Sequence, residues 1–292
     1  MREAPGGGEN HAAATCRDPP NGDYPMDEEG RFLARRSRYY SPRSLLYCRS
    51  HLGGLVALLD SLGRRVPPLG RPAAAFHTAM ERYTDRQSLR FDRRFGTDTF
   101  TRRALSDLGV GAASGYDFEG WLTGPVNQQF FREIIRNTPA DPRDFTFVDV
   151  GTGKGKAVML ATDYPFRRVI GVELSHELTE VARSNLRRYL AARGHTSTVQ
   201  LLCRDFMKYE APDEPVMFFF NNPFPSSIAD LAIRHVEASI ERNPRPVFVL
   251  YRKPGRAVRD RLASAPSLRP VRLTPFWCIY ASRSPGAASG SR

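Results

Sequence analysis

The chain lacks any apolar run long enough to cross a membrane, since about 20 consecutive apolar residues are needed to span the hydrocarbon core. Residues 1–30 also lack the apolar segment of a secretory signal. They carry two arginines against seven acids, a balance that argues against a transit peptide. We therefore expect a cytoplasmic protein with no membrane partner.

Cysteine and histidine are scarce and scattered. The four cysteines, Cys16, Cys48, Cys203 and Cys278, contain no Cys-x-x-Cys pair. This spacing favours reduced thiols over a zinc site or a disulfide framework. None of the six histidines lies in a recognisable motif. We therefore expect no metal, and a histidine general base is not supported.

Lysine is rare as well. Only four of the 43 basic residues are lysine, and the excess over 31 acidic residues gives a net charge of +12. This charge could form a surface for nucleic acid or another acidic partner. It could equally reflect ordinary basic surface positions that are filled by arginine. No long basic run is present, which favours the second interpretation.

Apolar residues, in contrast, make up 41% of the 292 residues, enough for a substantial core. We predict a disordered acidic tail over residues 1–30 and a helical N-terminal module over 31–114, which would select the substrate or cover the site. The main domain would span residues 115–283. The Gly/Ser/Ala-rich residues 284–292 would form a flexible tail.

From about residue 125 the pattern alternates between helix and strand. Helices are predicted over residues 125–137, from 157, over 175–193 and over 226–242. Strands are predicted over residues 145–150, 168–173, 199–203, 215–220 and 247–251, with a closing hairpin at 268–274 and 276–281. This alternation predicts an α/β fold with a doubly wound, mostly parallel sheet.

A glycine-rich turn, residues 149–155 (DVGTGKG), follows the first strand and opens a helix. Its glycines allow a tight turn and let a ligand approach the backbone. Glu173 ends the next strand, where an acid can accept hydrogen bonds from both hydroxyls of a ribose. The spacing does not fit a dinucleotide fingerprint, because Lys156 stands where the third glycine would be, and it does not fit a phosphate loop either.

These features resemble the class I S-adenosylmethionine-dependent methyltransferases over roughly residues 115–283. The resemblance implies a Rossmann-like, seven-stranded sheet with an antiparallel closing hairpin, and S-adenosyl-L-methionine as cofactor. It implies that Glu173 binds the ribose and Asp205 the adenine amine, with Phe206 beside the ring. The complete set of implied cofactor contacts is Asp149, Gly151, Thr152, Gly153, Gly155, Glu173, Asp205, Phe206 and Tyr116.

The segment after the fourth strand resembles the acceptor motif Asn/Asp-Pro-Pro-Tyr/Phe of amino-group methyltransferases. Asn221, Pro223 and Phe224 match it, and Asn222 departs from it. The resemblance implies that the three matching residues are catalytic, with oxygen acceptors orienting a nitrogen and an aromatic ring favouring the developing cation. Together with residues 204–206, the Asn-Asn pair also gives a weak local similarity to the non-SET histone-lysine methyltransferases. Alternatively, the two asparagines only cap the loop.

Several further residues have both a functional and a structural interpretation. Tyr116, Glu119 and Trp121 would contact the cofactor as part of a lid, or would only pack in the core or a hinge. Tyr251 could line the acceptor pocket, although core packing fits it better. The arginine pair in residues 91–96 could clamp an acidic acceptor, or the segment could simply pack on the sheet domain.

We therefore predict an enzyme that transfers a methyl group from S-adenosylmethionine to a nitrogen of a protein or small molecule, by in-line displacement. One alternative is a nucleic-acid methyltransferase, which the net charge favours although no binding motif supports it. The other alternative is a cofactor-binding scaffold without catalysis. The intact glycine turn and Glu173 favour cofactor binding but leave turnover and the acceptor open.

Overall fold

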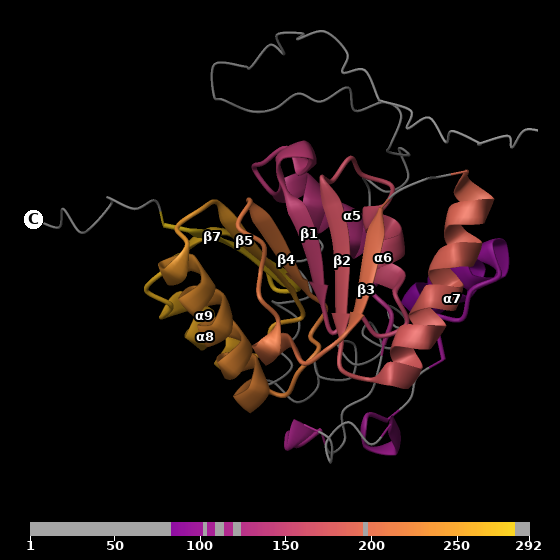
Figure 1. Ribbon diagram of the computed structural model, residues 1–292, viewed down its shortest axis with the longest axis horizontal. Coiled ribbons are helices and arrows are strands. Elements are labelled where there is room, and N and C mark those ends of the chain that lie inside the picture. Colours follow the sequence, from indigo (N-terminus) through magenta and orange to yellow (C-terminus); the bar gives the residue numbers. More distant parts are fainter. Residues whose placement is uncertain (1–82, 102–103, 109–113, 119–123, 195–197, 284–292) are drawn as a thin grey trace, which may run out of the picture.

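The computed structural model describes residues 83–101, 104–108, 114–118, 124–194 and 198–283. The predicted acidic tail, most of the predicted helical module and the C-terminal tail at 284–292 lie outside these residues. Figure 1 shows a central sheet with helices on both of its faces. The division into tail, module and main domain stays a prediction.

The sheet has seven strands in the order β3-β2-β1-β4-β5-β7-β6. The first five are parallel to one another, and β7 is antiparallel to both β5 and β6. This confirms the predicted Rossmann-like, mostly parallel sheet with an antiparallel closing hairpin. The strands are β1 (Thr146–Val150), β2 (Arg168–Glu173), β3 (Val199–Cys203), β4 (Val216–Phe220), β5 (Val247–Arg252), β6 (Leu268–Leu273) and β7 (Trp277–Ser282).

The central strands are apolar along nearly their whole length because helices cover both of their faces. All five residues of β1 and of β4 are buried. Successive side chains point to opposite faces. Val148 and Val150 therefore join one core cluster while Phe147 joins the other. Burial on both faces fixes the positions of these strands, so their carboxyl ends lie together at one edge of the sheet.

Two groups of helices form the outer layers. One core cluster contains residues of α8 (Ser226–Arg242) and α9 (Arg256–Ala263), and the other contains residues of α5 (Gln128–Asn137), α6 (Lys156–Ala161) and α7 (His176–Arg193). Figure 1 shows these groups on opposite sides of the sheet. The boundaries of α7 follow the sequence signals, since Ser175 caps its start and Gly194, at φ 65°, ends it.

Two described helices go beyond the predicted elements. The helix α9 was not predicted because half of its eight residues are charged and only Val258 and Leu262 are buried. Residues 83–95 are also helical, within the predicted helical module. Phe91 of this segment is 3% exposed and stacks on Tyr189 of α7, with ring centroids 5.5 Å apart. The described part of the module therefore packs directly on the sheet domain.

Candidate functional site

A pocket opens at the carboxyl edge of the sheet, where residues that follow β1, β2, β3 and β4 meet. The chain order reverses at β1, which lies between β2 and β4, and ligands of open α/β sheets bind at such a reversal. The space between the lining atoms, including the part open to solvent, is about 1040 Å³.

The glycine turn after β1 needs its glycines. Gly151, Gly153 and Gly155 have φ values of 69°, 53° and 86°, which side chains rarely adopt. A Cβ atom on Gly151 would lie 2.5 Å from the Cβ atom of Pro223, so this glycine lets the turn and the loop after β4 approach each other. A Cβ atom on Gly153 would meet nothing within 4 Å, because this residue borders the pocket.

Asp149 lies at the floor of the pocket and is 2% exposed. Its Oδ2 atom accepts a hydrogen bond of 2.6 Å from the hydroxyl of Thr152. Burial raises the pKa of Asp149 to about 7, and the nearby charge of Glu173 adds to the shift. Close packing here also explains Gly171 of β2, where a Cβ atom would lie 2.6 Å from the Thr152 hydroxyl. No sequence motif pointed to Gly171 as a position of close packing.

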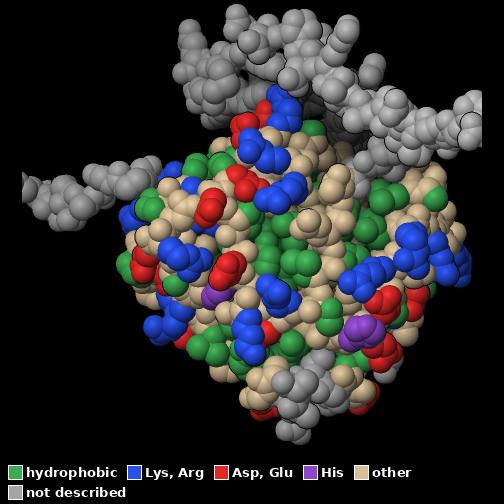
Figure 2. Space-filling view, viewed as in Figure 1, with side chains coloured by type: hydrophobic (Ala, Val, Ile, Leu, Met, Phe, Trp, Pro, Cys, Tyr) green, Lys and Arg blue, Asp and Glu red, His purple; other side chains and the backbone are tan. Residues whose placement is uncertain are grey.

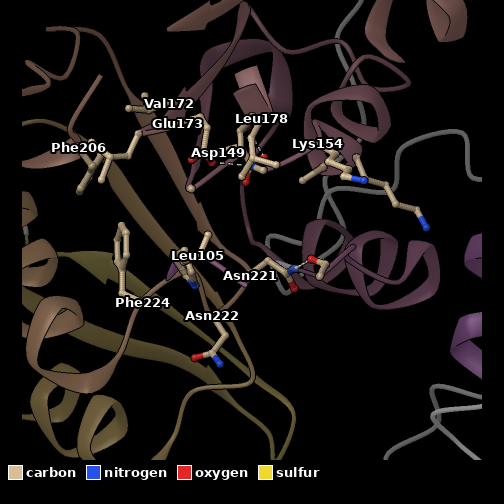
Figure 3. Close-up of a pocket in the computed structure, with 18 of the residues that line it drawn as sticks. Leu105, Asp149, Lys154, Val172, Glu173, Leu178, Phe206, Asn221, Asn222 and Phe224 are labelled. Carbon is tan, nitrogen blue, oxygen red and sulfur yellow. Dashed lines mark hydrogen bonds between the residues drawn. The ribbon is translucent and has the colours of Figure 1, made fainter. Parts of the chain in front are cut away.

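Glu173 ends β2 and is 7% exposed. Its Oε2 atom accepts from the backbone N–H of Gly153 at 2.7 Å, and its Oε1 atom accepts from that of Ser175 at 2.9 Å. Burial raises the pKa of Glu173, and these backbone hydrogen bonds oppose the rise. Figure 3 shows Asp149 and Glu173 close together in the pocket. Glu173 therefore also fixes the glycine turn.

Asp205, after β3, caps the short helix Phe206–Lys208 by accepting from the backbone N–H of Met207 at 2.9 Å. Its second oxygen accepts from the hydroxyl of Tyr116 at 3.2 Å. Burial and the charge of Asp205 raise the pKa of Tyr116. Phe206 is 4% exposed and also lines the pocket. The structure thus brings these three predicted residues together.

Asn221 connects two walls of the pocket. Its Nδ2 atom donates to the carbonyl oxygen of Gly124 at 3.1 Å, and its Oδ1 atom accepts from Nη1 of Arg252 at 3.3 Å. Both ends of the amide are therefore engaged, which fixes its orientation. The oxygen keeps one lone pair for a further hydrogen bond.

The rest of the predicted acceptor segment lines the same pocket. Asn222 has a φ of 52°, a conformation that asparagine tolerates better than most residues. Pro223 packs against Gly151, and Phe224 is a partly buried ring that packs on the core. The structure therefore brings the predicted catalytic residues and the glycine turn together in the lining of one cavity.

A clamp formed by Lys154, Asp98 and Asn185 ties the glycine turn to the N-terminal segment and to α7. Nζ of Lys154 lies 2.8 Å from Oδ2 of Asp98. Asn185 of α7 accepts from the backbone N–H of Asp98 and donates to the carbonyl oxygens of Asp98 and Lys154. No sequence motif pointed to this clamp, because its members are 87 and 31 residues apart.

Two buried cations near the pocket were not predicted as site residues. Lys156, which replaces a dinucleotide-type glycine, is 3% exposed and lines the pocket. Its Nζ atom donates to the hydroxyl of Ser88 at 2.9 Å and lies 4.9 Å from the ring centroid of Phe91. Burial lowers its pKa to about 8. The second cation, Arg252, contacts Asn221 as described above.

Among the described residues, Tyr251 and residues 91–96 do not line the pocket. The Tyr251 ring is buried in the core and stacks on Phe220 at 5.3 Å. In residues 91–96, the packing interpretation fits the buried Phe91, while Arg93 and Arg94 are exposed. Glu119 and Trp121 lie outside the described residues.

The described residues offer neither a metal site nor a membrane span. They contain no group of three or more His, Cys, Asp or Glu side chains that could hold a metal ion. Within the same residues, no helix is both long and apolar enough to cross a membrane.

No protein-family model matches the sequence, and no curated protein matches it. Similar solved structures include an RNA methyltransferase from Salinibacter ruber in complex with S-adenosyl-L-homocysteine, at 18% identity and a TM-score of 0.39, covering 57% of this chain and 97% of that chain. Another is the magnesium protoporphyrin IX methyltransferase of Synechocystis PCC 6803 with bound S-adenosyl-L-homocysteine, at 15% identity and a TM-score of 0.41, covering 71% and 99%. A third is a predicted N6-adenine-specific DNA methylase from Listeria monocytogenes, at 15% identity and a TM-score of 0.42, covering 62% and 55%. The names of all three describe a methyltransferase or a methylase.

Proposed function

We propose that this protein is an S-adenosylmethionine-dependent methyltransferase. The observation that carries the proposal is the set of acids at the ends of β1, β2 and β3, since Asp149, Glu173 and Asp205 all line one pocket beside a glycine turn. The glycine turn lacks the spacing of a dinucleotide fingerprint or a phosphate loop, and the acidic side chains around it disfavour a pyrophosphate. They suit a nucleoside that carries positive charge.

The described residues fit this cofactor. The left-handed Gly153 borders open space where a side chain would intrude. Glu173 is held by two backbone N–H groups and keeps lone pairs for ribose hydroxyls. Asp205 offers an acceptor for the adenine amine, with the Phe206 ring beside it. Lys156 supplies the positive charge that the carboxylate of the methionine part requires.

Bound S-adenosylmethionine supplies an electrophilic methyl group: the acceptor lone pair bonds to the methyl carbon, the carbon–sulfur electron pair returns to sulfur, and a proton leaves the methylated nitrogen for solvent. The protein needs no general acid, because the leaving thioether is neutral. Its residues align the acceptor and exclude water. In this proposal Asn221 orients the nitrogen, and Phe224 and Pro223 form the wall against which it packs.

The two alternatives, a nucleic-acid methyltransferase and a scaffold without catalysis, differ from this proposal in the acceptor and in turnover. On the face drawn in Figure 2, Lys and Arg side chains are interspersed with Asp and Glu and form no continuous basic stripe. This face therefore offers no footprint for nucleic acid, and the proposal takes a protein or a small molecule as the acceptor. A scaffold without catalysis would bind the cofactor in the same pocket and differ only in turnover.

Transfer of labelled methyl from S-adenosylmethionine into fractions of a host lysate tests the proposal. We expect label in the protein or small-molecule fraction, and at least a tenfold loss with Asn221→Ala. Asn243→Ala is the matched control, because Asn243 caps the far end of α8, away from the pocket. Label in the nucleic-acid fraction would select the alternative acceptor. Cofactor binding without any label would select the scaffold.

A further inference from the structure

Arg252 is a buried cation with an unpaired N–H donor. It is the last residue of β5 and is 8% exposed. Its one hydrogen bond to a described residue is the 3.3 Å contact from Nη1 to Oδ1 of Asn221. Its Nε atom is buried without a partner, and within the described residues no carboxylate forms an ion pair with it. A guanidinium has five N–H donors, and in Arg252 one is bonded to Asn221 while the buried Nε–H has no acceptor among the described residues.

Arg245 shows how the same fold treats a buried arginine with a purely structural role. It is 9% exposed and lies at the opposite edge of the sheet, before β5. Its guanidinium donates to the carbonyl oxygens of Glu214, Ser239 and Asn243 and to the Ser239 hydroxyl. Buried polar groups are normally paired in this way. Arg252 departs from the rule, and it does so next to the candidate acceptor residue.

The charge on Arg252 persists under neutral conditions. Burial lowers its pKa to about 10, so the guanidinium still carries a proton at pH 7. Lys156 lines the pocket, and the charge of Arg252 contributes to lowering its pKa, so the two cations are close enough to interact. Burying a charged guanidinium costs free energy, and an anion that binds beside it offsets this cost.

A second unused donor lies in the same neighbourhood. The guanidinium carbon of Arg252 is 5.1 Å from the ring centroid of Phe130, in the first turn of α5. Asn127 caps that turn through its Oδ1 atom and is 3% exposed, and its Nδ2 atom is buried without a partner. The first turn of α5 therefore carries both a ring that contacts Arg252 and, at its cap, a second buried donor without a partner.

We propose that the methyl acceptor carries an oxyanion, a carboxylate or a phosphate, close to the methylated nitrogen, and that Arg252 is its counter-ion beside Asn221. This inference rests on the proposed methyl transfer. An oxyanion would supply the missing acceptors, since a guanidinium matches the geometry of both groups. Its negative charge would also offset the positive charge that develops on the nitrogen near Arg252. A lysine side chain alone lacks such a group.

Two variants separate charge from packing. Arg252→Lys keeps the cation, and Arg252→Gln keeps a donor for Asn221 but removes the cation. Arg245→Gln is the matched control, because it removes an equally buried guanidinium away from the pocket. Calorimetry with S-adenosylhomocysteine comes first. We expect all four proteins to bind it within threefold of one another. Absence of binding to the wild type would refute the proposed function itself.

Methyl labelling of the small-molecule pool then tests the acceptor. We expect a labelled product that binds an anion exchanger at pH 7. Arg252→Gln should lower the rate of labelling at least tenfold, and this loss should be larger when the small-molecule pool is dilute. Arg252→Lys should retain most labelling, and Arg245→Gln should match the wild type per folded molecule. Phosphatase treatment of the pool abolishes labelling if the oxyanion is a phosphate monoester and spares it if it is a carboxylate.

A third readout does not depend on turnover. Titration of the S-adenosylhomocysteine-saturated protein with inorganic phosphate and with acetate should show binding of at least one ion to the wild type, weakened tenfold in Arg252→Gln. The proposal is overturned if neither ion binds, if the labelled product is cationic, or if no product forms although S-adenosylhomocysteine binds. A tenfold loss of S-adenosylhomocysteine affinity in Arg252→Gln would also overturn it, because Arg252 would then pair with the cofactor carboxylate.

Discussion

Replacing Asp149 by asparagine should change how the stability of the protein depends on pH. Burial raises the pKa of this carboxyl from 3.8 to about 7. A raised pKa means that the folded state holds the proton more tightly than the unfolded chain. The resulting stabilisation is complete at low pH and is lost as the pH rises toward 7. At about 1.4 kcal/mol per pKa unit, the loss between pH 5 and pH 8 is about 3 kcal/mol.

The amide that replaces the carboxyl in Asp149→Asn cannot ionise, and its oxygen can still accept a hydrogen bond from the hydroxyl of Thr152. Urea denaturation of both proteins at pH 5 and pH 8 measures the effect. The free energy of unfolding of Asp149→Asn, relative to the wild type, should rise by about 3 kcal/mol between the two pH values. Titrating groups that do not interact with Asp149 are common to both proteins and cancel in the difference, while the coupling of Asp149 to Glu173 is part of the measured effect. A difference that does not change with pH would refute the burial argument.

Three further substitutions test the fold and the turn. Gly151→Ala should lower stability by about 1–3 kcal/mol and abolish S-adenosylhomocysteine binding in calorimetry, because the new Cβ atom would meet Pro223 at 2.5 Å; unchanged binding would contradict the close approach. Phe147→Ala should cost about 3–5 kcal/mol in urea denaturation, since its ring is fully buried; a loss below about 1 kcal/mol would contradict that packing. Asp98→Asn should cost less than about 1 kcal/mol, because its side chain is 52% exposed where it pairs with Lys154; a larger loss would show that the clamp is worth more than an exposed ion pair.

Local signals in the sequence predicted the parts of the fold that depend on neighbours along the chain. The apolar run of β4, the cap at Ser175 and the glycine at 194 each act within one element, and the structure places them as expected. The helix α9 lacked such a signal. Only two of its residues, Val258 and Leu262, are buried, and its position depends on packing against the sheet.

The residues of the candidate site also fall into two groups, those that local sequence signals identified and those that they did not. The glycine turn and Glu173 could be identified because strand ends and turn glycines leave a pattern in the sequence. The roles of Arg252 and Asn185 could not, because each is defined by a contact with a residue far along the chain. In the sequence, Arg252 simply follows an apolar strand. Only the folded structure shows that its guanidinium is buried beside Asn221 without a carboxylate among the described residues.

The central claim is that the acidic pocket holds S-adenosylmethionine, and calorimetric titration with S-adenosylhomocysteine tests it most directly. We expect one site per chain, and at least a tenfold loss of affinity in Glu173→Ala, because this change removes both the proposed ribose acceptor and the bond that fixes Gly153. Glu210→Ala, which removes an exposed carboxylate outside the pocket, should bind like the wild type. No binding to the wild type, or equal binding to Glu173→Ala, would contradict the account.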